Sequence, residues 1–243
     1  MDNQPAHEAT ENGVQRKWNF PFPEFLAKLQ SQVDAPEHLI SDIYAKWVDT
    51  FEQDSMQFGY AAHILCTQAF DANASKVFKD KAKSTLRVID VGAGTGIVGG
   101  LLKDLGYTDV DGIDCCEAML QKARDKNIYK NVFVSFVDEK KNEALDDGIY
   151  DALISSAAIS PPLIQARAFD EMIRWVKKGG ILCFTIRQDS LDQPSYGYFE
   201  KFQKLEDEMK WHLIAKELVD YYKSEGSDDI FGSKAYICVY QVL

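Results

Sequence analysis

The sequence contains no uninterrupted apolar run of the roughly 18–20 residues that a membrane-spanning helix requires. Its first residues also lack the basic segment and the apolar segment of a secretory signal. Hydrophobic residues make up 46% of the 243 positions and aromatic residues 12%, which is enough for a buried core and excludes wholesale disorder. We therefore expect a soluble, cytoplasmic protein with no membrane partner.

Basic residues are outnumbered, because 27 Lys and Arg stand against 38 Asp and Glu, for a formal net charge of −11. A phosphate backbone favours a basic binding surface, so this balance argues against a nucleic-acid partner. An acidic excess mainly contributes to solubility. The oligomeric state is left open by the sequence.

Cysteine pairs typical of metal or redox sites are absent, because the five cysteines form no Cys-x-x-Cys motif. Cys183 and Cys238 lie in apolar runs, where a thiol behaves as a small buried hydrophobe. Cys115 and Cys116 are adjacent, so an extended backbone would point them to opposite sides. We expect neither a disulfide framework nor a metal site.

Composition and patterning divide the chain into three parts. Residues 1–17 are polar and are predicted to be a disordered tail. Residues 18–84 are predicted to form an N-terminal helical cap and a linker, because apolar residues follow helical spacing in two stretches, about 34–51 and 57–70. Residues 85–243 alternate between strand and helix patterns and are predicted to be the core domain.

Near-continuous apolar strands separated by helices indicate a parallel sheet that is covered on both faces. Strands are predicted at 86–91, 110–114, 132–137, 150–155 and 181–186. Helices are predicted at 97–105, 116–125, 166–176 and 198–211. Two last strands, 213–222 and 235–243, flank a Gly- and Asp-rich loop, which favours an antiparallel hairpin. The predicted fold is α/β, a Rossmann-like sheet of seven strands with a C-terminal antiparallel hairpin and the N-terminal helical cap.

The sharpest signal is a glycine-rich turn between the first strand and the first helix of the core. Residues 90–96 read Asp-Val-Gly-Ala-Gly-Thr-Gly, and glycines let a backbone turn sharply and approach a ligand closely. The spacing of Gly92, Gly94 and Gly96 is GxGxG, whereas dinucleotide-binding folds use GxGxxG. Asp90 at the strand end suits a ligand with an ammonium group better than a pyrophosphate. A turn used only for packing and a dinucleotide site are the alternatives.

Three acidic residues follow the next two strands. Asp114 ends the second strand, where its carboxylate can accept two hydrogen bonds from a ribose diol. Asp138 and Glu139 follow the third strand, where an adenine edge could be met. Ligands of open α/β sheets bind outside the carboxyl ends of the strands, so we expect these acids beside the glycine turn. For Asp138 and Glu139 the alternative is a solvated loop.

These motifs resemble the core of class I S-adenosylmethionine (SAM)-dependent methyltransferases, over residues 86–187. The run 88–96 resembles the first motif of that family, and Asp114 resembles its second-strand acid. The resemblance implies that SAM is the cofactor of the core domain and that S-adenosylhomocysteine is the product. It also implies that Cys115 and Met119 line the adenine pocket.

Further stretches extend the resemblance. Residues 44–51 resemble the N-terminal signature of small-molecule-type members, whose aromatic residues close over the cofactor, although core aromatics on a helix are the alternative. Residues 150–156 resemble the fourth strand of the family, and residues 184–190 resemble the methyltransferase-like protein 27 group, named for the Williams–Beuren region. The expected cofactor-binding residues are Tyr44, Trp47, Asp90, Gly92, Ala93, Gly94, Gly96, Asp114, Cys115, Met119, Asp138, Glu139, Ser155 and Ser156.

The run Ser160-Pro161-Pro162-Leu163 partly resembles the Asn/Asp-Pro-Pro-aromatic motif of enzymes that methylate amino groups of nucleic acids and proteins. In those families the motif follows the fourth strand directly. Here it begins about four residues after the predicted strand, starts with Ser and ends in Leu. We interpret it as a helix-initiating turn.

The predicted function is SAM-dependent methyl transfer to a small-molecule acceptor that the cap covers. Methyl transfer is an in-line displacement at an activated carbon, so alignment can supply most of the acceleration, and a general base is needed only for a protonated acceptor. Catalytic side chains stay unassigned, because no Ser-His-Asp spacing occurs and His38 and His63 are marked only by their place in the cap. The alternatives are a SAM-binding interaction or regulatory protein without turnover, and a protein or nucleic-acid methyltransferase.

Overall fold

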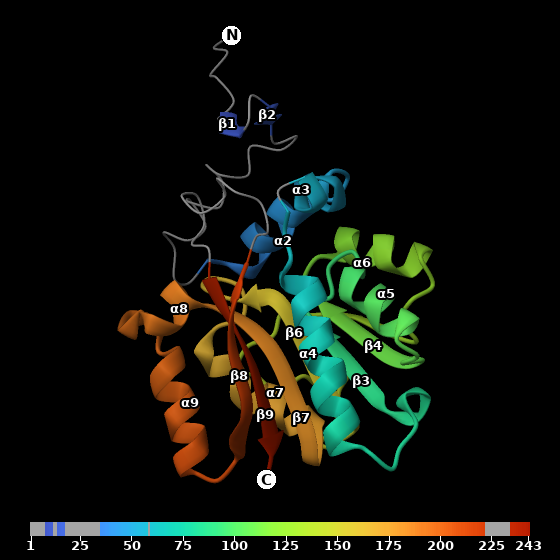
Figure 1. Cartoon of the computed structure of the whole chain (residues 1–243), viewed down its shortest axis with the longest axis vertical. Helices are drawn as coiled ribbons and strands as arrows, with labels where there is room; N and C mark the ends of the chain where they lie inside the picture. Colours follow the sequence, from blue (N-terminus) through green and yellow to red (C-terminus); the bar gives the residue numbers. More distant parts are fainter. Residues whose placement is uncertain (1–7, 12–13, 18–34, 58, 222–233) are drawn as a thin grey trace.

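A computed structural model describes residues 8–11, 14–17, 35–57, 59–221 and 234–243. Its main feature is a seven-stranded sheet in the order β5-β4-β3-β6-β7-β9-β8 (Figure 1). The strands are β3 (Arg87–Val91), β4 (Asp109–Asp114), β5 (Val132–Val134), β6 (Tyr150–Ile159), β7 (Val176–Arg187), β8 (Trp211–Asp220) and β9 (Lys234–Val242). Strands β3 to β7 are parallel, and β9 runs antiparallel to β7 and β8. The predicted Rossmann-like fold is confirmed.

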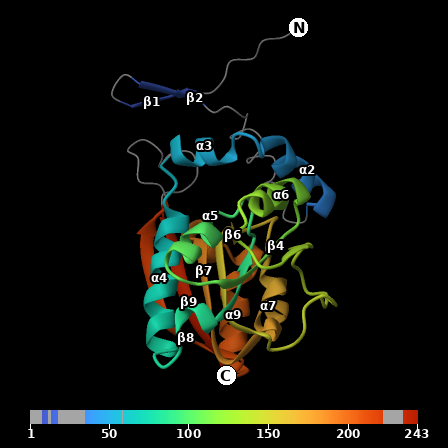
Figure 2. The ribbon, with the colours of Figure 1, turned by 90° about the vertical axis from the view of Figure 1, so that its right-hand side faces the viewer.

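Helices cover both faces of this sheet. Figure 2 shows α4 (Ala62–Val77) on one side, and α7 (Phe169–Trp175) and α9 (Tyr198–Asp207) on the other. Helix α5 (Ile97–Asp104) packs on the same face as α4. The remaining elements are α6 (Glu117–Asp125), α8 (Gln188–Asp192) and the short 3₁₀ turns η1 (Lys83–Thr85), η2 (Ala166–Ala168) and η3 (Pro194–Tyr196).

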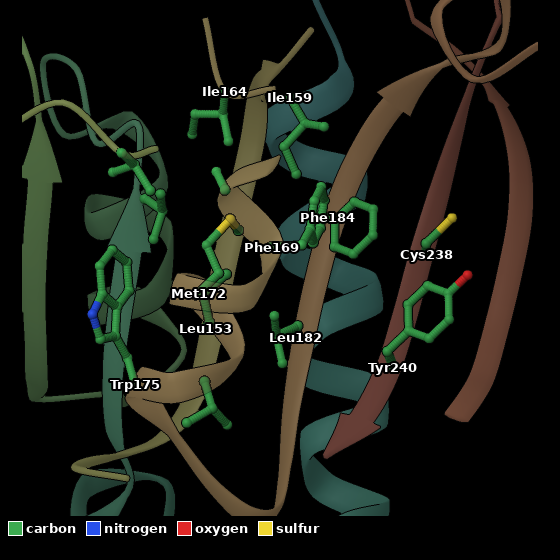
Figure 3. Close-up of a cluster of buried hydrophobic side chains, with 14 of the residues drawn as sticks. Leu153, Ile159, Ile164, Phe169, Met172, Trp175, Leu182, Phe184, Cys238 and Tyr240 are labelled. Atoms are coloured by element: carbon green, nitrogen blue, oxygen red, sulfur yellow. The ribbon is translucent and has the colours of Figure 1, made fainter. Parts of the chain in front are cut away.

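The side chains of the sheet alternate between two hydrophobic cores, because successive residues of a strand point to opposite faces. Ile154 of β6 belongs to the core under α4 and α5, whereas its neighbour Leu153 belongs to the core under α7 and α9. Figure 3 shows Phe169, Met172 and Trp175 of α7 in this second core. Burial on both faces explains why the central strands are almost wholly apolar.

Two helices, α2 (Glu37–Trp47) and α3 (Phe51–Gln57), lie above the carboxyl ends of the parallel strands (Figures 1 and 2). The sequence predicts a helix over about residues 34–51, but α2 ends at Trp47 and the chain turns before α3 begins at Phe51. The buried carboxylate of Asp54 accepts hydrogen bonds from Trp47 Nε1 at 2.7 Å and from Thr50 Oγ1 at 2.9 Å, which fixes the turn. The cap thus covers the edge of the sheet where ligands of α/β folds bind.

Two short strands, β1 (Glu8–Glu11) and β2 (Val14–Lys17), pair antiparallel inside the segment for which the sequence predicts a disordered tail. The rest of that tail, residues 18–34 of the predicted cap, and most of the loop between the last two strands lie outside the described residues. The boundaries between tail, cap and core therefore stay predictions.

Strand β5 ends at Val134, earlier than the predicted 137, and two other strands extend well beyond their predicted limits. The sequence predicts that β6 ends at Ser155, but it continues to Ile159 after a register shift against β7. Strand β7 begins earlier than predicted, because α7 ends at Trp175 and Val176 is already extended. Residues 177–180 therefore lie in the strand. Because they are lysines and glycines, the apolar pattern of the sequence did not indicate that the strand begins before residue 181.

Candidate active site

The glycine-rich loop joins the end of β3 to the start of α5. Gly92, Gly94 and Gly96 have positive φ angles of 75°, 53° and 86°, which residues with side chains rarely adopt. A Cβ atom on Gly92 would stand 2.3 Å from the Cβ of Ala158 on β6. Glycine at position 92 is therefore required by the space available as well as by the backbone angle.

The end of β4 holds this loop in place. The amides of Gly92 and Ala93 both donate to the carbonyl oxygen of Ile113, at 2.9 and 3.1 Å. The amide of Gly94 donates to Oδ2 of Asp114 at 2.9 Å. Three consecutive amides are thus used inside the protein, whereas a dinucleotide loop directs its amides at a pyrophosphate. The geometry disfavours a dinucleotide.

Asp114 is enclosed, yet it keeps capacity to accept further hydrogen bonds. Its Oδ1 accepts the amide of Cys116 at 2.8 Å, in addition to the bond from Gly94 to Oδ2. Burial raises the pKa of the Asp114 carboxyl, and these backbone donors act in the opposite direction. Each carboxylate oxygen has two acceptor sites, so one remains on each for the hydroxyl groups of a ligand.

Asp90 is buried, and its carboxylate has a partner within the protein. The Tyr129 hydroxyl donates to Asp90 Oδ2 at 2.6 Å, and Asp90 is 1% exposed. Burial raises the pKa of the Asp90 carboxyl to about 7, and the nearby charge of Asp114 adds to this effect. The sequence predicts contact with an ammonium group, but Asp90 is not among the residues that line the cavity beside the loop.

That cavity lies between the glycine-rich loop and the cap and is partly open to solvent. Nine of the residues predicted to bind the cofactor line it: Tyr44, Trp47, Gly92, Ala93, Gly94, Asp114, Cys115, Met119 and Ser156. Five do not: Asp90, Gly96, Asp138, Glu139 and Ser155. The fold thus brings residues from four distant segments of the chain together at one cavity.

The two acids predicted to meet an adenine edge interact with their surroundings instead. Oδ1 of Asp138 accepts the amide of Lys140 at 2.8 Å, so its carboxylate folds back on its own loop. Glu139 forms an ion pair with Arg167 at 2.8 Å. The Glu139 side chain is 53% exposed, which agrees with the solvated-loop alternative, whereas that of Asp138 is only 14% exposed. Neither residue lines the cavity.

The two serines near the end of β6 have different surroundings. Ser155 Oγ donates to the carbonyl oxygen of Val91 at 2.8 Å and so ties β6 to β3. Ser156 lines the cavity, and its buried Oγ has no hydrogen-bond partner among the described residues. A buried hydroxyl without a partner is costly, so Ser156 marks a place where a ligand can supply one. Gly96 instead packs against Ala123 of α6, where a Cβ would stand 3.1 Å from the alanine Cβ.

Aromatic residues of the cap close one side of the cavity. Tyr44, Trp47 and Phe51 line it, and the rings of Trp47 and Phe51 meet edge to face with centroids 4.7 Å apart. Burial and the neighbouring Asp114 raise the pKa of the Tyr44 hydroxyl, which therefore stays protonated and able to donate. These three rings give the cap a largely apolar wall that carries the Tyr44 hydroxyl.

The other end of the cavity contains residues to which the sequence analysis assigns no role. We call Tyr60, His63, Arg187 and Tyr221 the acceptor end. Tyr60 and His63 lie at the start of α4, Arg187 ends β7, and Tyr221 follows β8. The sequence could have indicated Arg187 as a site residue, because it ends a predicted parallel strand and ligands of α/β sheets bind at the carboxyl ends of strands. No pattern in the sequence marks Tyr60 or Tyr221.

His63 is the titratable base of the acceptor end. Its ring stacks on Tyr60 with centroids 5.3 Å apart, and its buried Nδ1 has no hydrogen-bond partner among the described residues. Burial lowers the pKa of His63 below its usual 6.5, because a charged imidazolium loses hydration there. His63 is therefore a neutral imidazole at pH 7, and a neutral imidazole can accept a proton.

The turn from Ser160 to Leu163 lies closer to the cavity than the sequence predicts. Because β6 continues to Ile159, the turn follows the strand directly, so the predicted gap between strand and turn is wrong. Ser160 and Leu163 both line the cavity. The pairing of β6 with β7 shifts register after Ser155, so the sequence pattern did not indicate that the strand continues.

Within the described ranges, no three His, Cys, Asp or Glu side chains are grouped so that they could hold a metal ion. All five cysteines are free thiols. The helices of the same part of the chain include none with the length and apolar character needed to cross a membrane.

Known proteins with similar sequences identify the class. Residues 88–180 match the family described as "Methyltransferase domain". Methyltransferase-like protein 27 from Homo sapiens is 24% identical over 207 residues, which cover 84% of this chain and 82% of that protein. The match spans the cap as well as the core.

Solved structures of methyltransferases share the fold. Magnesium protoporphyrin IX methyltransferase from Synechocystis PCC 6803, with S-adenosylhomocysteine bound, is 12% identical with a TM-score of 0.60, covering 85% of this chain and 99% of that chain. A chain in the complex of the Haloferax volcanii Trm112 methyltransferase activator with a methyltransferase is 15% identical with a TM-score of 0.59, covering 83% and 96%. The chain is a class I SAM-dependent methyltransferase, and SAM is its cofactor.

We predict that Gly92→Ala lowers stability by about 2 kcal/mol or more, because a non-glycine residue in the left-handed region costs roughly 1–2 kcal/mol before any clash with Ala158. Gly100→Ala is the matched control, since a Cβ on this helical glycine of α5 has no neighbour closer than 3.8 Å. The control should be unchanged or more stable by up to about 1 kcal/mol. Urea unfolding of both variants measures the difference, and equal effects would contradict the account of the loop.

A second prediction concerns Asp90. Its folded-state pKa of about 7 exceeds the usual 3.8, so the folded protein binds more protons than the unfolded chain between these values. The wild type should therefore lose stability relative to Asp90→Asn as the pH rises from about 4 to about 7, by at most about 4 kcal/mol at about 1.36 kcal/mol per pKa unit. Above about pH 7 the difference should stay constant. Urea unfolding of both proteins across this range measures it, and a pH-independent difference would show that Asp90 is ionised throughout.

Proposed function

We propose that this methyltransferase transfers the methyl group of SAM to a small-molecule acceptor that binds in the same cavity as the cofactor. The observation that carries the proposal is the single cavity that reaches from the glycine-rich loop to the acceptor end under an aromatic cap. Residues of both ends line this one cavity, so a cofactor at one end and a small acceptor at the other would lie side by side.

The residues of the cavity fit SAM. Asp114 keeps acceptor sites for a ribose diol, and Cys115 and Met119 beside it offer apolar surface to an adenine ring. Ser156 offers a buried hydroxyl that needs a partner. Gly92 lets the backbone approach the ligand without a side chain. Among the other residues expected at the site, Asp90, Gly96 and Ser155 act indirectly by holding the loop and strands in place.

When bound, SAM supplies a methyl group on a positively charged sulfur, which is already activated for displacement. The glycine-rich loop and Asp114 hold the cofactor from the β3–β4 side. Tyr44, Trp47 and Phe51 exclude water from above, which strengthens electrostatic interactions inside the cavity. His63 can take the proton that a hydroxyl or thiol acceptor loses as its nucleophilic atom is methylated. Fixed alignment of the reacting atoms supplies the rest of the acceleration.

The assignment of His63 as the base predicts its titration. In NMR of the full chain, the ring signals of His63, assigned by their loss in His63→Gln, should titrate below pH 6.5 because burial disfavours the charged ring. Since the unfolded chain then binds more protons, stability should fall as the pH drops below about 6.5. Titration above 6.5 would mean that the imidazole is charged at neutral pH and unsuited to accept a proton.

The cofactor site predicts a ligand-dependent rise in the unfolding temperature. At about 100 times its Kd, SAM should add about 2.7 kcal/mol, or roughly 5–10 °C for a chain of this size. Asp114→Ala should abolish the rise, whereas Asp109→Ala, on the same strand but in a surface pair with Lys130, should keep it. A rise of equal size in all three proteins would contradict the role of Asp114.

The same assay decides the role of Asp138. Because its carboxylate bonds to Lys140, Asp138→Asn should bind SAM within about twofold of the wild type. A loss of tenfold or more would instead support the contact with adenine that the sequence predicts. Formation of S-adenosylhomocysteine with any acceptor would exclude the alternative of a SAM-binding protein without turnover.

A further inference from the structure

The acceptor end lies well apart from the residues that would hold the ribose of the cofactor. Asp114 ends β4 and Arg187 ends β7, and two strands, β3 and β6, lie between these in the sheet. At about 4.8 Å between neighbouring strands, the two positions are roughly 14 Å apart. Both residues nevertheless line one cavity. A second small molecule can therefore reach Arg187 while the cofactor contacts Asp114.

Asp189 binds one edge of the Arg187 guanidinium and leaves the other edge available. Arg187 Nε donates to Asp189 Oδ1 at 3.0 Å, and Nη2 donates to Oδ2. Nη1 makes no hydrogen bond with any described residue. A guanidinium carries five N–H donors in a planar fork, so donors remain on Nη1 and Nη2. That edge has the geometry that binds a carboxylate through two parallel hydrogen bonds.

The two members of this ion pair differ in exposure. The Asp189 side chain is 54% exposed and does not line the cavity, whereas the Arg187 side chain is only 14% exposed and does. Asp189 thus orients the guanidinium from the solvent side. Because little of the Arg187 side chain is exposed, a second ion pair with it is screened less than one on the surface.

Charge is distributed unevenly along the cavity. Among the described residues that line the cavity, only Arg187 is a lysine or arginine, and only Asp114 carries a carboxylate. The anionic end at β4 suits the positively charged cofactor, and the cationic end at β7 suits a negatively charged acceptor. The chain as a whole carries a net charge of −11, so an excess of basic residues does not explain why a cation lies in the cavity.

Aromatic rings line the same cavity as Arg187. Tyr60 and Tyr221 meet edge to face with centroids 5.1 Å apart, and their hydroxyl groups are 3.4 Å apart. The ring of His63 stacks on Tyr60. Flat rings offer large, rigid contact area to a planar ligand, with polar groups at their rims.

Building on the proposed function, we infer that the acceptor is a small aromatic molecule with a carboxylate, and that this carboxylate binds the open edge of Arg187. Arg187 is then the residue that sets acceptor specificity, and Asp189 is a positioning residue. The rings of Tyr60 and Tyr221 contact the body of the acceptor. A neutral analogue of the same shape leaves the guanidinium edge without a charged partner, so it binds more weakly.

The test compares 4-hydroxybenzoate with 4-hydroxybenzamide, two probes of nearly equal shape that differ in charge. Their dissociation constants are measured by ligand-observed NMR on the full chain, with and without saturating S-adenosylhomocysteine. The wild type should bind the carboxylate at least tenfold more tightly than the amide. Arg187→Gln should reduce this ratio to about one, and Arg187→Lys, which keeps the charge but loses the fork, should give an intermediate ratio.

Arg124→Gln is the matched control, because Arg124 pairs with Glu117 on the surface of α6 and does not line the cavity. It should keep the wild-type ratio. A ratio near one in the wild type, or an unchanged ratio in both Arg187 variants, overturns the inference while leaving the proposed function intact. Failure of S-adenosylhomocysteine to bind contradicts the proposed function instead, and the probe ratio without it still decides the role of Arg187.

Discussion

The end of β4 is the constraint on which the rest of the site depends. Ile113 and Asp114 together accept the amides of Gly92, Ala93 and Gly94, so the loop that begins at β3 is fastened to the neighbouring strand. The same carboxylate accepts the amide of Cys116, which sets the start of α6. One strand end therefore fixes three things relative to one another: the glycine-rich loop, the carboxylate of Asp114, and the start of α6, where we propose that the adenine of SAM lies.

The cap is attached to this same unit. Lys126, which follows α6, pairs with Glu52 of α3 and donates to the carbonyl oxygen of Thr95 at 2.9 Å. A second ion pair joins Asp49 to Lys122 of α6 at 3.0 Å. Exposed pairs of this kind contribute little to stability. The cap is therefore held mainly by apolar contacts, in which the buried Ile40 and Ile43 pack with Cys115, Phe136 and Leu163.

The sequence could predict the parts of the protein that follow from local pattern. Apolar runs predicted the succession of strands and helices in the core. The GxGxG spacing and Asp114 predicted the residues at the end of the cavity where we propose that SAM binds. The sequence could not predict that Asp90 turns to Tyr129 or that Asp138 turns to Lys140, because both choices depend on tertiary neighbours. The end of β6 could not be predicted either, because its register shift against β7 also depends on tertiary neighbours.

Sequence patterns could not predict the acceptor end, because the topology of the fold brings its residues together from distant parts of the chain. Tyr60, His63, Arg187 and Tyr221 come from three distant segments, and only the antiparallel return of β9 and β8 brings Tyr221 beside the start of α4. The amide of Ala61 donates to the carbonyl oxygen of Tyr221 at 3.1 Å, which fixes that approach. Motifs of the cofactor site carry no information about such contacts, and fold alone does not define an acceptor.

The central claim is that cofactor and small acceptor share one cavity. The most direct measurement incubates the full chain with SAM labelled in its methyl group and a cell extract, then separates small molecules from macromolecules. The account predicts that label is transferred to the low-mass fraction by the wild type and not by Gly92→Ala. Label found only in protein or nucleic acid would contradict it.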